Sequence, residues 1–211
     1  MAQQNRNRHM KIYLIRHGET EWNHLRKMQG QMDIPLNEYG IELAEKTAEG
    51  MKDIKFDRIF ASPLVRAKKT AEIIAANSCV EVETDDRLKE INFGEGEGSD
   101  INEVKADPSH PLHNFFIHPE QFVPMEGGET FAQVQKRGLE FLKEVVFPLE
   151  GSVENVAVVA HAAIIRSIML HVKDRELKDF WGGVYYKNCC VCEVECQDGR
   201  MTALEEAKVY Y

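Results

Sequence analysis

The sequence has no long apolar run. No stretch of its 211 residues approaches the roughly 18 consecutive apolar residues that a membrane-spanning helix needs. The first ten residues, Met1 to Met10, are polar and lack the apolar centre of a secretory signal peptide. We therefore expect no membrane partner, a cytoplasmic location, and a disordered leader or cloning remnant at residues 1–10.

The sequence also has no excess of positive charge. It carries 26 lysines and arginines against 35 aspartates and glutamates, which gives a formal net charge of −9. Proteins that bind nucleic acid over a large surface usually carry a net positive charge, so we expect no nucleic-acid partner. An anionic small molecule is not excluded, because a local cluster of cations is enough to bind it.

Motifs that bind metal ions are missing too. The sequence contains no His-Glu-x-x-His motif, no EF-hand loop and no two paired Cys-x₂-Cys motifs. Of its five cysteines, four lie close together at Cys189, Cys190, Cys192 and Cys196. A zinc cluster is one interpretation. We favour a strand with reduced thiols. Alternate residues of a strand point to the same face, so Cys190, Cys192 and Cys196 would share an apolar face with Val194. We expect no metal.

What is present is an alternation of apolar strands and amphipathic helices. Such an order is typical of an α/β fold, and here it predicts a three-layer αβα sandwich around a mostly parallel central sheet. A final hairpin turns at Asp198-Gly199, and its exposed strands would allow a homodimer. The predicted strands cover residues 11–15, 56–61, 80–83 and 155–160, and the predicted helices cover 37–51, 64–76, 130–146 and 162–171.

One segment departs from this alternation. Residues 92–128 are rich in glycine and proline, and we expect a long loop there with one short helix. Long loops inside compact domains are usually functional or disordered. We therefore predict a single catalytic domain over residues 11–211, with a loop-rich cap over its site at about 92–128.

Two histidines follow directly on apolar strands. His17 comes after the strand that ends at Ile15, with Arg16 beside it, and His161 comes after the strand of residues 155–160. In open α/β sheets ligands bind beyond the carboxyl ends of the strands. Arg66 lies just past another strand end, and arginine forks match phosphate oxygens. The pattern predicts a phosphate pocket.

The segments that carry these residues resemble the histidine phosphatase superfamily, which includes the cofactor-dependent phosphoglycerate mutases. The first matching segment is LIRHGETEWN, from Leu14 to Asn23. The remaining matches follow in order, at Gln29-Gly30, Asp33, Pro35-Leu36, SPLVRAKKTA from Ser62, RLKEINFG from Arg87, GGET from Gly127 and VVAH from Val158.

The resemblance implies a phosphoglycerate mutase-like fold and a role for each matching residue. His17 would be the nucleophile that forms a phosphohistidine, and Glu90 would be the proton donor to the leaving group. The groups implied to bind the phosphoryl oxygens are Arg16, Arg66, His161 and Asn23, with Gln29, Gly30 and the backbone N–H of Ala162 as further binding positions.

This chemistry sets demands on the charge of each group. His17 must be neutral to attack, with its second ring nitrogen held by a hydrogen bond for which the carbonyl of Gly18 is a candidate. His161 can act as a cation, so we expect opposite charge states for the two rings. Glu90 needs a raised pKa to carry a proton. Glu95 and Glu97 are weaker candidates for that role.

The sequence departs from the family at two places. Ala162-Ala163 stands where the family usually has glycine after the second histidine, and Glu95-Gly96 stands where tryptophan is frequent. We expect a phosphomonoester phosphatase acting on a small phosphorylated metabolite. The alternatives are a phosphoglycerate mutase, which would require 2,3-bisphosphoglycerate as a cofactor, and a non-catalytic phosphate-binding module.

Overall fold

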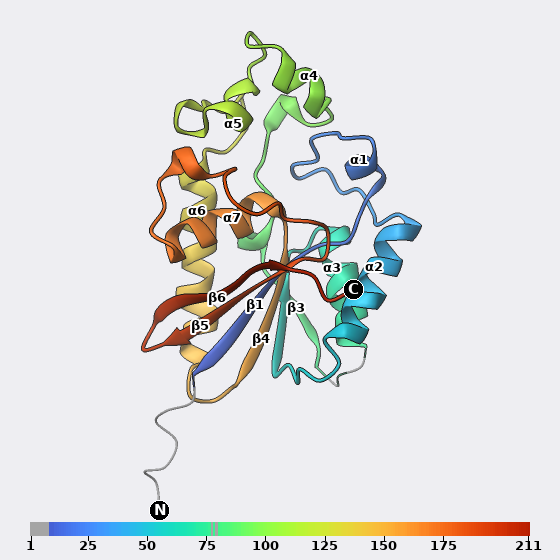
Figure 1. The fold of residues 1–211 in the computed structure, drawn as a ribbon, viewed down its shortest axis with the longest axis vertical. Helices are drawn as coiled ribbons and strands as arrows, with labels where there is room; N and C mark the ends of the chain where they lie inside the picture. Colours follow the sequence, from blue (N-terminus) through green and yellow to red (C-terminus); the bar gives the residue numbers. More distant parts are fainter. Residues whose placement is uncertain (1–8, 77, 79) are drawn as a thin grey trace, which may run out of the picture.

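In the computed structural model the described residues are 9–76, 78 and 80–211 (Figure 1). Most of the expected leader, residues 1–8, lies outside the described residues. The first strand begins at Met10, inside the range expected to be leader, because the Met10 side chain is fully buried in the core.

A six-stranded sheet with the order β3-β2-β4-β1-β5-β6 forms the centre of the molecule. The first four strands in this order are parallel, whereas β5 pairs with β1 and β6 with β5 in antiparallel fashion. The strand bounds are Met10–Arg16 for β1, Arg58–Ala61 for β2, Val82–Thr84 for β3, Asn155–Ala160 for β4, Val191–Gln197 for β5 and Arg200–Lys208 for β6.

The two central strands set the position of the two histidines. β1 and β4 are buried on both faces over most of their length, as is typical of apolar strands inside a parallel sheet. Their register pairs Arg16 with Ala160, and the N–H of His17 donates to the carbonyl of Ala160 over 3.0 Å. His17 and His161 therefore leave the sheet side by side at the same edge.

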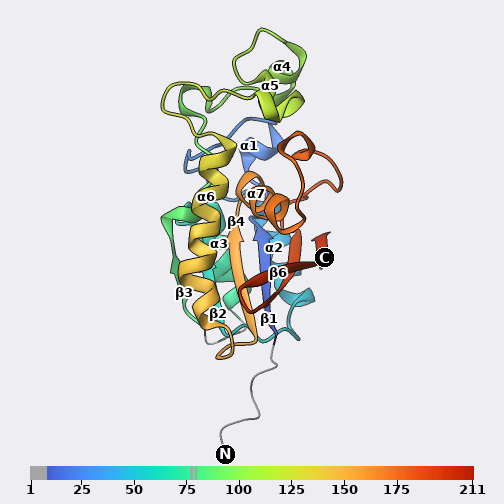
Figure 2. The ribbon, with the colours of Figure 1, turned by 90° about the vertical axis from the view of Figure 1, so that its left-hand side faces the viewer.

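Helices cover both faces of the sheet, which confirms the three-layer αβα sandwich (Figures 1 and 2). The face that carries Ile12 and Leu14 packs against α6 and α7, whereas the face that carries Tyr13 and Ile15 packs against α2 and α3. The bounds are Glu38–Gly50 for α2, Val65–Ala75 for α3, Phe131–Phe141 for α6 and Ala162–Val172 for α7.

Side-chain caps fix where the helices begin. Asn37 accepts a hydrogen bond from the N–H of Gly40 at the start of α2, and Thr130 forms a capping box at the start of α6. The helix expected to reach Val146 ends at Phe141 as an α-helix. It continues as a π-helical turn, Leu142–Val146, and ends in a 3₁₀ turn that contains Pro148, a residue that cannot continue a helix.

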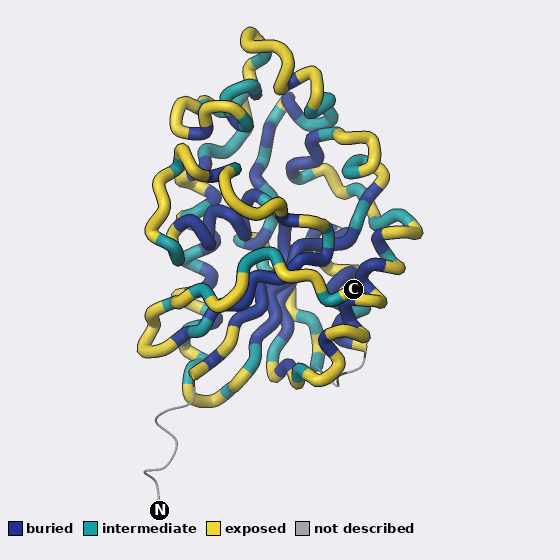
Figure 3. The backbone as a smooth tube through the Cα atoms, viewed as in Figure 1, coloured by how far each residue is buried: buried dark blue, intermediate teal, exposed yellow. Residues whose placement is uncertain are grey.

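The segment 92–128 forms a cap at the end of the molecule toward which β1 and β4 point (Figures 1 and 2). It contains two short helices, α4 (Ile101–Ala106) and α5 (His113–Ile117), where one was expected. The outer turns of the cap are exposed and its underside is buried (Figure 3). Phe115 anchors the underside, because its ring packs against five other aromatic rings, those of Phe93, Phe116, Phe122, Phe131 and Trp181.

The cysteine-rich segment forms β5 and the residues just before it, as the strand interpretation requires. Cys190, Cys192 and Cys196 are buried with Val194 in the core beneath α6 and α7. Over residues 9–76, 78 and 80–211, no group of three or more His, Cys, Asp or Glu side chains is arranged to hold a metal ion. None of the helices in the same described part of the chain is long and apolar enough to span a membrane.

Candidate active site

A cavity of about 470 Å³ opens at the carboxyl ends of β1 and β4, under the cap. It brings together residues that lie far apart in the sequence. Eight of the nine predicted site residues line it, namely Arg16, His17, Asn23, Gln29, Gly30, Arg66, Glu90 and Ala162. The ninth, His161, is fully buried just behind, with its ring centroid 5.1 Å from that of His17.

The ring of His17 is fixed in one orientation. Its Nδ1 lies 2.6 Å from the carbonyl oxygen of Gly18, and because a carbonyl can only accept, Nδ1 carries the proton. The Nε2 lone pair is therefore the free one. Burial, with Arg66 and Arg16 nearby, holds the pKa of His17 well below its usual value. The ring is neutral near pH 7, as a nucleophile requires, and the expected Gly18 partner is the one observed.

Two arginines reach the cavity from different elements. Arg66 on α3 is fully buried, and its guanidinium donates to the carbonyls of Met32 and Gly30, both over 2.7 Å. Burial lowers the pKa of Arg66 to about 10, so the group remains a cation near pH 7. Arg16 at the end of β1 donates from Nη1 to the carbonyl of Tyr186 over 2.5 Å.

His161 differs from the expectation that it is a cation. Its Nε2 lies 2.8 Å from the hydroxyl of Ser62. Burial, followed by the charge of Arg66, keeps the pKa of His161 well below its usual value. Both histidine rings are therefore neutral near pH 7, because burial and the two neighbouring arginines disfavour a further positive charge there. An anion beside the rings would raise both pKa values.

Unpartnered donors mark the centre of the site. In the described part of the chain, four buried side-chain nitrogen or oxygen atoms have no hydrogen-bond partner. Three of them are Arg16 Nε, Arg66 Nε and His161 Nδ1, and the fourth is the hydroxyl of Ser167. A buried polar atom without a partner costs about 1–3 kcal/mol, so such atoms are rare and indicate a ligand when they cluster.

Glu90 lies at the N-terminus of α7. Its carboxyl oxygens accept from the N–H groups of Ile91, Ala163 and Ile164 over 3.0, 3.2 and 3.3 Å. These hydrogen bonds and Arg66 favour the charged form, but burial outweighs them and the pKa of Glu90 is raised. A raised pKa is what a proton donor needs.

The two weaker carboxyl candidates lie elsewhere. Glu95 is exposed and lies outside the cavity lining. Glu97 accepts from the N–H of Gln31 over 2.7 Å and packs under Gly30, where a Cβ would overlap its carboxyl group. Gly30 also has a φ of +51°, a conformation that favours glycine at this position. Glu97 thus supports the backbone around the cavity.

The remaining predicted residues hold local structure as well as lining the cavity. Asn23 closes a capping box with Thr20 on the short helix α1 (Glu21–His24), and Thr20 also donates to the side-chain oxygen of Gln29 over 2.9 Å. Ala162 opens α7 without a positive φ. Alanine therefore fits this turn. The next two N–H groups of α7, those of Ala163 and Ile164, donate to Glu90, whereas the N–H of Ala162 does not.

Sequence reasoning missed several residues that line the cavity. Asn188 donates to the carbonyl of His17 over 3.1 Å and to the side chain of Asn23 over 3.3 Å. Arg166 contributes a buried guanidinium, and Lys105 contributes an amine from the cap. Asn188 lies in an irregular segment and Arg166 on a buried helix, where residue type alone gives no signal of a site. Aromatic walls come from Phe115, Phe116, Trp181 and Tyr185.

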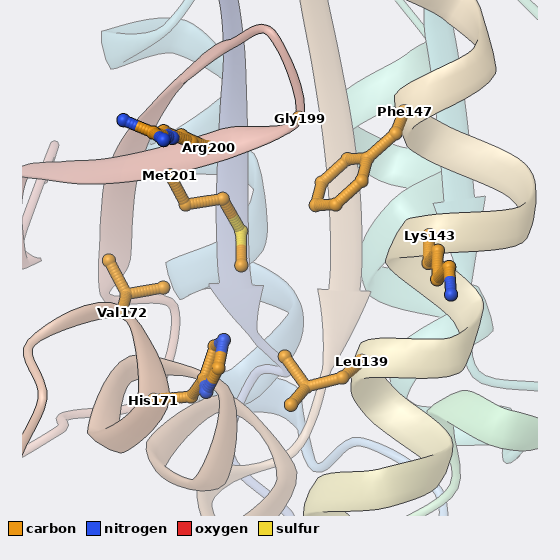
Figure 4. A pocket seen from close by; sticks show the side chains of 8 residues that line it. All are labelled: Leu139, Lys143, Phe147, His171, Val172, Gly199, Arg200 and Met201. Carbon is orange, nitrogen blue, oxygen red and sulfur yellow. The ribbon is translucent and has the colours of Figure 1, made fainter.

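A second pocket of about 440 Å³ lies between α6, α7 and the β5–β6 turn, and its lining includes neither His17 nor His161 (Figure 4). Its polar side chains, Lys143, His171 and Arg200, are exposed to solvent. No unpartnered buried polar atom belongs to the residues that line it. It therefore lacks the features that distinguish the cavity at the histidines.

Comparison with known proteins agrees with this geometry. The histidine phosphatase superfamily (branch 1) matches residues 12–207. The uncharacterized phosphatase PhoE of Bacillus subtilis is 34% identical over 189 residues, covering 87% of this chain and 87% of PhoE. YhfR of Bacillus stearothermophilus has a TM-score of 0.88 at 32% identity, covering 95% of this chain and 98% of that chain.

A phosphoserine phosphatase mutant of Entamoeba histolytica, solved in complex with phosphoserine, is a further structural relative. It has a TM-score of 0.82 at 30% identity, covering 94% of this chain and 97% of that chain. The family match extends over nearly the whole described chain and includes every segment that contributes to the cavity. The chain therefore belongs to the histidine phosphatase superfamily and is a phosphoglycerate mutase-like enzyme of the phosphatase class.

Proposed function

We propose that this enzyme hydrolyses a small phosphomonoester through a phosphohistidine on His17, with Glu90 as the proton donor. One observation carries the proposal. Two unpartnered buried donors, Arg16 Nε and Arg66 Nε, and the unpartnered Nδ1 of His161 surround the histidine whose Nε2 lone pair is free. A tetrahedral dianion is the ligand that such a set of donors fits.

In the first step, Nε2 of His17 attacks phosphorus and the bond from phosphorus to the ester oxygen breaks. The leaving oxygen takes the proton of Glu90, so an alcohol departs and a carboxylate remains. Arg16 and Arg66 neutralise the charge on the transferring phosphoryl group, which is the main contribution a protein makes to this reaction. The Gly18 carbonyl stabilises the positive charge that His17 gains.

In the second step, water resolves the phosphoenzyme. The Glu90 carboxylate takes a proton from water as its oxygen attacks phosphorus, and the phosphorus–nitrogen bond breaks. His17 leaves as a neutral ring, and Glu90 is protonated again. Each residue thus returns to its starting state after one turnover, and no step requires a metal ion.

The cavity supports a small substrate. A volume of about 470 Å³ accommodates a phosphoryl group with a metabolite-sized alcohol, not a macromolecule. Since the Entamoeba histolytica relative is described in complex with phosphoserine, phosphoserine is the first candidate to test. The cationic rim at Arg26, Lys27 and Lys105 favours substrates that carry an anionic group besides the phosphate.

A panel of phosphorylated metabolites, with phosphoserine, 3-phosphoglycerate and p-nitrophenyl phosphate included, tests the proposal. We expect phosphate release from at least one metabolite, abolished in His17→Ala and retained in the control His24→Ala, which replaces an exposed histidine. Isomerisation of 3-phosphoglycerate without phosphate release would establish a mutase instead. Binding of phosphate with no turnover of any ester would leave only a binding module.

A further inference from the structure

The guanidinium of Arg166 is buried and lines the cavity, and the proposed mechanism does not use it. It lies on α7, five residues after His161, and donates to three backbone carbonyls of one segment. The distances are 2.9 Å to Phe180, 3.4 Å to Gly182 and 2.6 Å to Val184. Its guanidinium carbon also lies 4.1 Å from the ring centroid of Tyr186. Arg166 thus ties residues 180–186 to α7.

The side chains at the two ends of this segment, Phe180 and Tyr186, are buried, and the Tyr186 hydroxyl donates to Glu206 over 3.0 Å, but the middle of the segment has little else to hold its shape. Residues 182–186 contain no helix or strand, and Gly183 has a φ of +76°. The side chains of Val184 and Tyr185 are 49% and 74% exposed, so they contribute little packing. The backbone of 182–184 therefore depends on the guanidinium for its position.

The segment carries the carbonyl that holds Arg16. The Tyr186 carbonyl is the acceptor of the Arg16 Nη1 hydrogen bond, and the Arg16 Nε beside it has no partner and is free for a phosphate oxygen. An arginine side chain has several rotatable bonds, and fixing it before the substrate binds removes that entropic cost from the binding step. The position of Tyr186 thus determines where Arg16 presents its free donor.

We propose that Arg166 is a positioning residue, which holds residues 180–186 so that the Tyr186 carbonyl orients Arg16 for the phosphoryl group. The inference rests on the proposed function, because it assigns Arg16 to that group. The proposal requires a fork and not merely a charge, since a single lysine ammonium cannot span three carbonyls and stack on Tyr186.

The test compares Arg166→Met and Arg166→Lys with wild type and with His171→Gln, an exposed change on the same helix. The readouts are kcat/KM for two substrates with different leaving groups, and the inhibition constant of orthophosphate. We expect both Arg166 variants to lose about 10- to 100-fold in kcat/KM, less than the 10²–10³ expected for losing Arg16 itself. The loss should be equal for both substrates, and orthophosphate should bind correspondingly more weakly.

A double substitution separates positioning from a merely structural role. In Arg16→Met the residue that Arg166 positions is already gone, so adding Arg166→Met should lower kcat/KM by no more than about 3-fold further. Should Arg166→Met unfold the protein, Tyr186→Leu provides a milder variant. It removes the ring that stacks on Arg166, and it should show a smaller loss with the same independence of the leaving group.

Three outcomes would overturn the inference. They are full activity in Arg166→Lys, losses that multiply in the double variant, and a loss that depends on the leaving group, which would place Arg166 on the substrate itself. The failure of the proposed function is a separate result. If the proposed function fails, the wild-type enzyme releases no phosphate from any ester. If only the Arg166 inference fails, the wild-type enzyme is active but the variants do not show the expected losses.

Discussion

At the residue scale, the site contains ionisable groups whose burial disfavours their charged forms. His17 and His161 are buried beside two arginines, so the pKa of each ring is lowered, whereas burial raises the pKa of Glu90. Near pH 7 the lowered histidine pKa values favour two neutral rings, and the raised pKa of Glu90 increases the protonated fraction of its carboxyl group. That combination supports nucleophilic attack by one group and proton donation by another.

The lowered histidine pKa values predict a pH-dependent stability. In the unfolded chain both rings protonate near pH 6.5, whereas in the folded protein they resist protonation. As the pH falls below about 6.5, the unfolded state therefore takes up protons first. The free energy of unfolding should fall by up to about 1.4 kcal/mol per pH unit for each ring.

Urea unfolding between about pH 7.5 and 5.5 measures this slope. His161→Gln should reduce it by roughly the contribution of one proton, and His24→Gln, at an exposed position, should leave it unchanged. An undiminished slope in His161→Gln would show that this ring does not titrate as its burial requires.

The role of Glu90 predicts a dependence on the leaving group. An alkoxide leaves poorly without a proton, so Glu90→Gln should slow transfer from alkyl phosphates by about 10²–10⁴. Because p-nitrophenolate leaves without a proton, the pre-steady-state burst from p-nitrophenyl phosphate should be much less affected. Glu95→Gln is the matched control in the same segment. Equal losses for both substrates in the burst phase would exclude Glu90 as the proton donor.

At the scale of elements, a close backbone contact holds the loop that follows His17. Gly40 in the first turn of α2 packs directly on the loop after His17, and a Cβ at this position would overlap the backbone of Glu19. Gly18 lies equally close on the other side, where its own Cβ would come within 2.5 Å of the Gly40 carbonyl oxygen. Helix α2 therefore fixes the backbone that carries His17.

Gly40→Ala tests this contact. In an exposed helix the change would stabilise by up to about 1 kcal/mol, because alanine is the better helix former. Here we expect a destabilisation of about 1–3 kcal/mol and a lower kcat, since backbone cannot move aside as a side chain can. Thermal unfolding and activity are the measurements, with Glu45→Ala on the same helix as a near-neutral control. A more stable Gly40→Ala enzyme would contradict the contact.

The strands and helices that position the site follow from local patterns. The apolar runs that end at Arg16 and at Ala160 predicted β1 and β4, and the N-cap at Asn37 predicted α2. Parallel packing then brings the two histidines to one edge, so the centre of the site was predictable from the sequence. The cysteine-rich strand was predictable for the same reason, since its period of two survives in the fold.

Other features depend on contacts between distant parts of the chain. The hydrogen bonds of Arg166 and Asn188 reach irregular segments, and no local pattern predicts where those segments pass. The shared neutrality of His17 and His161 is likewise a result of burial beside arginines from two other elements. The second short helix of the cap, α5, has no side-chain cap and is held by the aromatic packing of Phe115.

At the scale of the molecule, this acidic protein contains a cavity whose charged lining residues are mostly cations. The formal net charge is −9, yet the cavity is lined by six arginines and lysines and by two glutamates, Glu19 and Glu90. Such a local field would attract the phosphorylated substrate that we propose. The cap adds the aromatic side chains of Phe115 and Phe116 to the cavity wall.

The formation of a phosphohistidine at His17 is the claim on which the account depends. The most direct measurement mixes the Glu90→Gln enzyme with p-nitrophenyl phosphate, quenches at alkaline pH, and locates the phosphoryl group by mass spectrometry and ³¹P NMR. We predict an acid-labile phosphoryl group on Nε2 of His17, absent from His17→Ala. A phosphoryl group on any other residue, or turnover by wild type with no phosphoenzyme in either protein, would contradict the account.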